Sequence, residues 1–268
     1  MLKRSVLAAA MAVLFAASAA SAGEPAHSFT VGPEVYWVKY KEPGVMRNEG
    51  VMYGVSLGYR YDAPTGLMLG ADLAVAAGEV DYDSQGTGSM ENNDDTRLEA
   101  RLLAGYGFKP AQGLTFTPYA GLGYRFLRND SAGKVSTTGD VGYERRSNYF
   151  YLPVGVAAVK ALSGGWKVTG TAEFDWMFYG RQYSDLSGTG HGLPDIDNRQ
   201  DHGIGLRASL GVEKDLSEAL GAKASLAFEP FVRYWRIAKS ELEYAAGAAW
   251  YEPKNKTTEI GAALSLRF

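Results

Sequence analysis

The last twelve residues of the chain, 257–268, alternate in character along their whole length. One set is mostly apolar: Thr258, Ile260, Ala262, Leu264, Leu266 and Phe268. The set between them is small or charged: Glu259, Gly261, Ala263, Ser265 and Arg267. Successive side chains of a β-strand point to opposite faces, so this period of two predicts a strand with one apolar face and one polar face.

Segments with the same period recur through the chain. We expect ten strands, at residues 29–41, 50–62, 66–82, 96–109, 114–129, 143–160, 165–183, 202–214, 222–240 and 256–268. Short connections (63–65, 110–113, 162–164 and 215–221) alternate with long polar ones (41–49, 83–95, 130–142, 184–201 and 241–255). Eight strands would leave much of the chain unassigned, and twelve would split a continuous segment.

The apolar face of these strands is expected to point outward, toward lipid. Strand 50–62 offers Val51, Tyr53, Val55, Leu57 and Tyr59, and the strands at 96–109, 165–183 and 202–214 follow the same pattern. In lipid the unpaired edges of an open sheet are costly, and closing the sheet removes both edges. The predicted fold is therefore all-β, a closed antiparallel up-and-down transmembrane barrel of ten strands. A water-soluble barrel with ordinary aromatic packing is the alternative.

The inward face carries nearly balanced charges, and each buried charge needs a partner. We therefore predict an arginine–carboxylate network in the lumen, formed by Glu34, Arg60, Asp72, Glu99, Arg101, Arg125, Glu173, Asp175, Arg207, Glu229, Arg233, Glu259 and Arg267. Inward glycines such as Gly54 and Gly123 leave room for these side chains. A polar plug is the favoured interpretation, because barrels of about eight strands are filled by their own side chains. A gated channel or a proton path is the alternative.

The N-terminus has the features of a secretory signal peptide. Lys3 and Arg4 precede an apolar run at 6–17, and Ala20-Ser21-Ala22 is a cleavage signature, which makes 1–22 a signal peptide and 23–268 one barrel domain. Loss of two cations would lower the net charge from -3 to -5, which disfavours nucleic-acid binding. The chain has no cysteine, which excludes disulfides and thiol catalysis.

Two features resemble bacterial outer-membrane β-barrel proteins. One is the terminal strand that stops on Phe268, and the other is the run Thr-Pro-Tyr-Ala-Gly-Leu-Gly-Tyr-Arg at 117–125, which is similar to a segment of small barrels in this group. The resemblance implies an outer-membrane location with both termini in the periplasm. It also implies Phe268 as an assembly signal for the barrel-assembly machinery, with membrane lipid and lipopolysaccharide as partners.

Ten strands is also the number in the omptin proteases, which have an extracellular aspartate pair and an Asp–His pair. Asp81, Asp83, Asp201 and His202 lie at corresponding loops. The alternation of faces along the strands argues against a protease site. It predicts that Asp81, Asp83 and His202 point outward and that only Asp201 points inward. A lipid-modifying Ser–His site is the other enzymatic alternative, but the three histidines (His27, His191 and His202) lack convincing partners.

Acidic groups in the long connections are a candidate Ca²⁺ or Mg²⁺ site. They are Glu91, Asp94, Asp95, Asp195, Asp197 and Asp201. Residues 195–198 lack the glycine and final glutamate of an EF-hand, so we expect solvated loop charges instead. The sequence thus predicts no catalytic residue, metal site or cofactor, and a structural role or a surface interaction with an unidentified ligand. A narrow pore for small solutes is the first alternative, and an omptin-like surface protease is the second.

Overall fold

The computed structural model describes residues 26–268. The predicted signal peptide and its cleavage site lie outside these residues. In the described part of the chain, no helix has the length and apolar character needed to cross a membrane.

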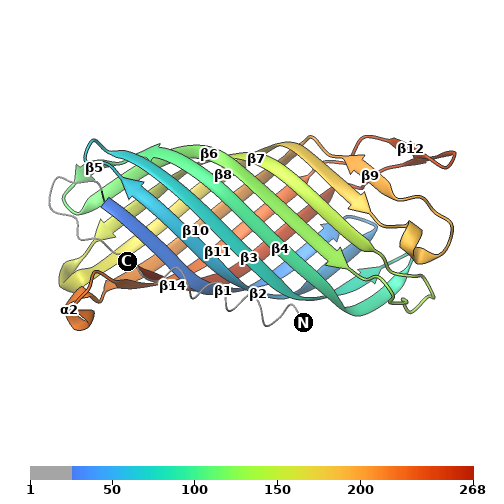
Figure 1. Ribbon diagram of the computed structural model, residues 1–268, viewed down its shortest axis with the longest axis horizontal. Helices are drawn as coiled ribbons and strands as arrows, with labels where there is room; N and C mark the ends of the chain where they lie inside the picture. The colour runs from blue at the N-terminus through green and yellow to red at the C-terminus, as the bar shows by residue number, and fades with distance from the viewer. Residues whose placement is uncertain (1–25) are drawn as a thin grey trace.

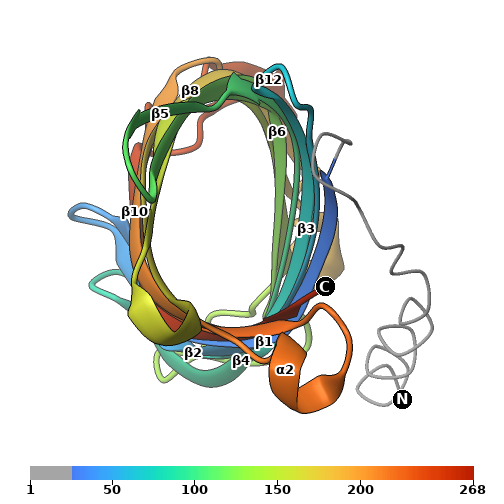
Figure 2. The same cartoon turned by 90° about the vertical axis from the view of Figure 1, so that its left-hand side faces the viewer.

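Ten long antiparallel strands form a closed ring (Figures 1 and 2). In order around the ring they are β1 (Ala26–Glu42), β2 (Met46–Asp62), β3 (Leu67–Ser84), β4 (Gly88–Tyr106), β6 (Leu114–Asp130), β7 (Glu144–Ala161), β8 (Trp166–Ser184), β10 (Gly203–Asp215), β11 (Ser225–Ile237) and β14 (Asn255–Arg267). The ring closes where β14 pairs with β1, and Phe268 exchanges backbone hydrogen bonds with Phe29. The predicted ten-stranded fold is confirmed.

Connections at the two ends of the barrel differ in length. The end at the left of Figure 1 carries the turn at 63–66, the short strand β5 (Phe108–Ala111), the 3-10 turn η3 (Ser163–Gly165) and the helix α2 (Ser217–Leu220). The opposite end carries η4 (Ser187–Thr189), β9 (Ile196–Arg199) and a hairpin of β12 (Glu243–Ala245) and β13 (Ala248–Trp250). We call this opposite end the loop end.

Two of the five predicted long loops are wrong. β1 and β2 pair without a break out to Glu42 and Met46, and β3 and β4 pair out to Ser84 and Gly88, so tight turns replace the loops predicted at 41–49 and 83–95. Both faces of the strand ends that extend to these turns are largely polar, so the alternation of apolar and polar residues is absent there. Backbone pairing does not depend on that pattern, so the ladders continue.

The exposure of side chains separates the two faces of the wall. Outward residues are well exposed, with Tyr53 at 67% and Leu102 at 63%, whereas the inward Glu259 is at 1%. Exposed aromatics also lie toward both ends, with Trp37 and Trp176 in the half nearer the loop end and Phe108 and Trp166 near the short turns. This inverted arrangement, apolar outside and charged inside, suits a barrel surrounded by lipid.

Candidate functional site

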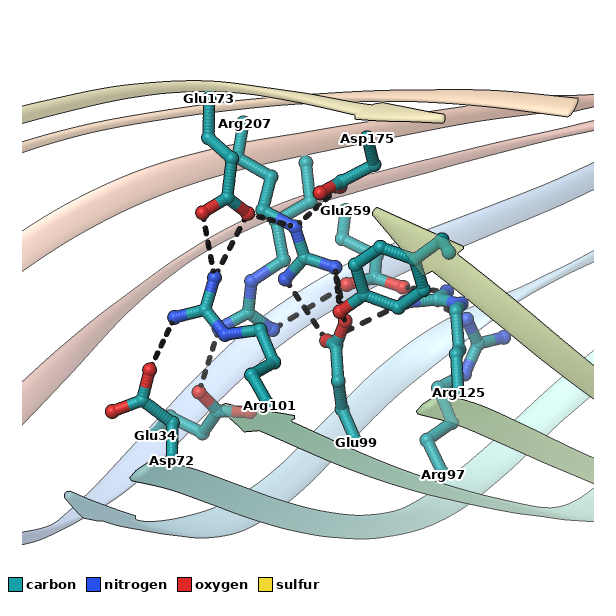
Figure 3. A network of polar contacts seen from close by, with 12 residues as sticks. Glu34, Asp72, Arg97, Glu99, Arg101, Arg125, Glu173, Asp175, Arg207 and Glu259 are labelled. Atoms are coloured by element: carbon teal, nitrogen blue, oxygen red, sulfur yellow. Dashed lines mark hydrogen bonds and ion pairs between the residues drawn. The ribbon is translucent and has the colours of Figure 1, made fainter. Parts of the chain in front are cut away.

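The centre of the lumen is occupied by a network of arginines and carboxylates, shown in Figure 3. Arg207 on β10 is its hub. Its Nε lies 2.8 Å from Asp175 Oδ2, and its Nη1 lies 2.9 Å from Glu99 Oε2. The Tyr151 hydroxyl donates to the same Glu99 carboxylate. Because Glu99 is on β4, and three strands (β6, β7 and β8) separate β4 from β10 around the ring, this contact crosses the lumen.

A second set of contacts converges on Glu259 of β14. Arg125 Nη2 on β6 lies 2.5 Å and Arg97 Nη1 on β4 lies 3.0 Å from the same oxygen, Glu259 Oε1. Arg233 approaches the other oxygen at 3.5 Å and also pairs with Glu34 at 2.9 Å. Glu259 therefore faces three guanidinium groups in a buried site.

Arg101 links two further carboxylates from opposite walls. It lies 2.8 Å from Asp72 on the neighbouring strand β3 and 2.8 Å from Glu173 on β8. The Tyr119 hydroxyl donates to Glu173 at 2.8 Å, so this carboxylate has partners on two sides. The side chain of Glu173 is fully buried. We call the residues joined in this way the central network: Glu34, Asp72, Asp95, Arg97, Glu99, Arg101, Arg125, Glu173, Asp175, Arg207, Arg233 and Glu259.

Three residues of the predicted network lie apart from the central network. Arg60 pairs with Asp62, two residues along its own strand, at 2.7 Å. Arg267 pairs with Glu213 at 2.6 Å near the short-turn end. Glu229 is half-buried between these regions, near Arg267 and Arg233. These residues lie outside the central network, although Arg60 Nη2 also reaches the Thr117 hydroxyl on β6 at 3.5 Å.

Two members of the central network were missed from the sequence. Arg97 and Asp95 share the parity of Glu99 and Arg101 along β4, and both are buried, with Arg97 Nε 3.0 Å from Asp95 Oδ1. The prediction that Asp95 is a solvated loop charge is wrong, because β4 begins at Gly88 and includes Asp95. Arg97 lies at an inward position of the predicted strand 96–109, and extending that strand backward by one residue would have reached Asp95.

Large inward aromatics pack against glycines on the adjacent strand. A Cβ at Gly155 would lie 2.6 Å from Tyr119 Cζ, and a Cβ at Gly123 would overlap the Tyr151 ring. Each such aromatic is the direct register partner of its glycine: Tyr36 with Gly261, Tyr119 with Gly155, Tyr149 with Gly180, Tyr151 with Gly123, and Trp235 with Gly205. The missing side chain lets each ring lie close to the wall, beside the ionic groups.

A separate charged cluster lies at the loop end, and we call it the mouth cluster. Arg145 Nη2 lies 2.6 Å from Glu42 Oε1 and also contacts Glu252 Oε1. Tyr40 donates to Glu42 at 2.8 Å and to Glu252 at 3.3 Å. Burial raises the pKa of Glu252 to about 8, Arg145 opposes this rise, and the Glu42 carboxylate adds to it. Sequence reasoning missed this cluster because Glu42 and Glu252 fall in segments predicted as loops.

The candidate protease residues do not converge on one site. Asp81 and Asp83 are exposed, where Asp81 accepts a hydrogen bond from the Asn92 amide and Asp83 lies 3.8 Å from Arg47. Asp201 pairs with Arg199 at 2.8 Å, and His202 is exposed. The outward positions of Asp81, Asp83 and His202 agree with the predicted strand phase.

The side chains of the other histidines and of the acidic loop residues either contact nearby residues or are exposed to solvent. His27 Nδ1 lies 2.9 Å from the Tyr59 hydroxyl at an exposed position, and His191 is exposed. Asp195 accepts from the Tyr183 hydroxyl at 2.7 Å, and Asp197 pairs with Arg181 at 2.8 Å. Within residues 26–268 no group of three or more His, Asp or Glu side chains could hold a metal ion.

Comparison with known proteins bears on the fold and the family. The family model described as "Outer membrane protein beta-barrel domain" matches residues 7–157. The outer membrane protease OmpT from Escherichia coli has a TM-score of 0.62 at 10% identity, covering 94% of this chain and 98% of its own. The translocator domain of the autotransporter NalP from Neisseria meningitidis has a TM-score of 0.46 at 13% identity, covering 98% and 94%. No curated protein matches the chain in sequence. At 10% identity, the likeness to OmpT shows the fold alone.

Proposed function

Because the chain belongs to the outer membrane protein beta-barrel domain family, we propose that it is a closed, non-catalytic barrel with a structural or surface-interacting role. Family membership places it in the bacterial outer membrane. The interacting surface is the loop end, where η4, β9 and the β12–β13 hairpin extend beyond the barrel.

One observation carries the closed state: the central network joins strands that are not neighbours. Arg207 to Glu99, Arg101 to Glu173 and Arg125 to Glu259 each cross the lumen. The participating carboxylates Glu173 and Glu259 are at most 1% exposed. A continuous water path through this layer would require several of these buried pairs to separate together.

The orientation follows from the two unlike ends. Both Phe29 and Phe268 lie at the short-turn end, which in outer-membrane barrels faces the periplasm. The proposal therefore puts both termini in the periplasm and the loop end at the cell surface. Phe268 would meet the barrel-assembly machinery during insertion, and the outward apolar wall would contact membrane lipid and lipopolysaccharide.

Conductance in planar bilayers tests the closed state. The wild-type barrel is expected to show no steady single-channel openings. A double variant, Arg101→Ser with Arg207→Ser, removes two transluminal side chains and is expected to conduct. The matched control is Arg60→Ser, which lies outside the central network, loses the pair with Asp62 and a 3.5 Å hydrogen bond to Thr117, and should remain silent. Steady openings of the wild-type protein would favour the small-solute pore instead.

Peptide cleavage tests the protease alternative. The exposed positions of Asp83 and His202 support the expectation that the purified barrel, in lipopolysaccharide-containing vesicles, leaves a library of peptides intact. Cleavage that is lost on Asp83→Ala or His202→Ala would overturn the non-catalytic proposal.

A further inference from the structure

Residues 238–254 connect β11 to β14 at the loop end of the barrel, and the two roots of this segment are joined to each other. The amide of Ser240 donates to the Glu252 carbonyl at 3.0 Å, and the Glu252 amide donates to Ser240 Oγ at 2.8 Å. Between these roots the segment forms the β12–β13 hairpin, which carries exposed Leu242 and Tyr244. The Glu252 side chain is directed away from this exposed hairpin and is buried.

Glu252 meets partners from two walls that are not neighbours in the ring. Glu42 and Tyr40 come from β1, and Arg145 comes from β7, which four strands separate from β1 in either direction around the ring. These contacts span the mouth of the barrel and tie the segment across it. The titratable and charged groups that face Glu252 are Tyr40, Glu42, Tyr143, Arg145 and Tyr149.

The charges in this cluster do not balance. Glu42 Oε1 and Glu252 Oε1 both contact the same nitrogen, Arg145 Nη2, so one guanidinium serves two buried carboxylates. The rest of the guanidinium does not offset this excess of negative charge. Arg145 Nε has no partner among the described residues, and Arg145 lines a cavity of about 30 Å³. Two carboxylates this close cannot both ionise at low cost, so the closed arrangement requires a shared proton.

We propose that Glu42, Arg145 and Glu252 form a proton-operated latch that holds residues 238–254 across the barrel mouth and releases them when the proton is lost. Release frees Arg145, which lines a small polar cavity together with Asn48 and Asn129. Asn48 Oδ1 is buried there without a partner in the described residues, so entry of water satisfies it. The exposed apolar hairpin then becomes free to reorient at the cell surface.

The direction of the pH response follows from the raised pKa of Glu252. The closed state binds the proton more tightly than an open state, in which this carboxyl returns toward its ordinary value of 4.5. Closure is therefore strongest below pH 4.5 and weakens as the pH rises to about 8. Across this interval the opening equilibrium constant is expected to rise by up to roughly tenfold per pH unit and then level off.

Spin-label distances can follow the latch, because the chain contains no cysteine that would react elsewhere. Labels on Ala249→Cys in the hairpin and Ala132→Cys beyond β6 occupy exposed sites on opposite loops. In lipid vesicles at pH 4.5 we expect one narrow distance distribution, and a second population that grows up to about pH 8. Hydrogen exchange at residues 238–252, corrected for the intrinsic pH dependence of exchange, detects openings too rare for the labels.

Three variants make the outcome decisive. Glu252→Gln removes the titrating group, and Glu42→Gln leaves one carboxylate for Arg145, so both variants are expected to stay closed across the pH range. Glu241→Gln, at an exposed position in the same root, should keep the wild-type profile. A wild-type segment that shows no pH response by either method, or an equal response in Glu252→Gln, would overturn the latch. Conductance is expected to stay absent at every pH, because the central network remains in place.

Discussion

Replacing Glu259 by Gln tests whether the central network is held by buried charge. The substitution keeps the size of the side chain and removes the negative charge that Arg97, Arg125 and Arg233 share. Arg97 retains Asp95 at 3.0 Å and Arg233 retains Glu34 at 2.9 Å. Arg125 is left with Glu99 at 3.9 Å, so it bears most of the loss.

The expected magnitude follows from the burial of Arg125. Its side chain is 4% exposed, so water cannot replace the missing carboxylate. Breaking a buried pair by removing one partner costs about 3–5 kcal/mol. Gln can still accept one hydrogen bond, which puts the expected loss at the lower end, about 3 kcal/mol, or roughly 150-fold in the unfolding equilibrium constant.

Urea unfolding in phospholipid vesicles, followed by tryptophan fluorescence, measures this loss. Glu49→Gln is the matched control, because Glu49 forms a 2.6 Å pair with Lys39 in which both side chains are about one-third exposed. Partly exposed pairs contribute about 0–1 kcal/mol, so the control should change stability little. Equal stability changes in the two variants would refute the view that the buried network holds the lumen together.

Two further changes test the packing and the assembly of the barrel. Gly123→Ala places a Cβ against the Tyr151 ring and is expected to cost about 1–3 kcal/mol in the same unfolding assay, whereas Gly86→Ala, which has open space around it, should be neutral. An unchanged midpoint for Gly123→Ala would contradict the glycine–aromatic packing. Phe268→Ala is expected to reduce the heat-modifiable, membrane-inserted fraction in cells far more than Phe228→Ala, which truncates another outward Phe. Equal insertion of the two variants would remove the assembly role of Phe268.

The period of two was enough to predict the membrane-facing part of each strand. Leu102 and Leu206 point outward and Glu99 and Arg207 inward, as their parity requires. The prediction stopped where both faces of a strand became polar, as in the extensions to Glu42 and Ser84. Beyond the apolar band, hydrogen bonding between backbones decides the structure, and side-chain hydrophobicity carries no signal of it.

The mouth cluster was beyond prediction for a different reason. Its residues, Glu42, Arg145 and Glu252, come from parts of the chain more than one hundred residues apart, and each sits next to a connection. Parity says on which side of a wall a residue lies, but not which residue of the far wall it meets. That depends on strand tilt and register around the whole ring.

The filling of the lumen has the same origin, and it supports the proposal that the ten-stranded barrel is closed. Tyr151 lies in register with Gly123 on the adjacent strand, so the ring fills the space that a side chain would occupy. Its hydroxyl is then positioned to donate to Glu99, which meets Arg207 from across the lumen. The glycine, the aromatic ring and the ion pair therefore form one packed unit. Conduction through this layer requires the unit to move as a whole. A single substitution in the unit is therefore expected to lower the stability of the barrel without opening it. Conductance is expected only when two transluminal arginines are lost.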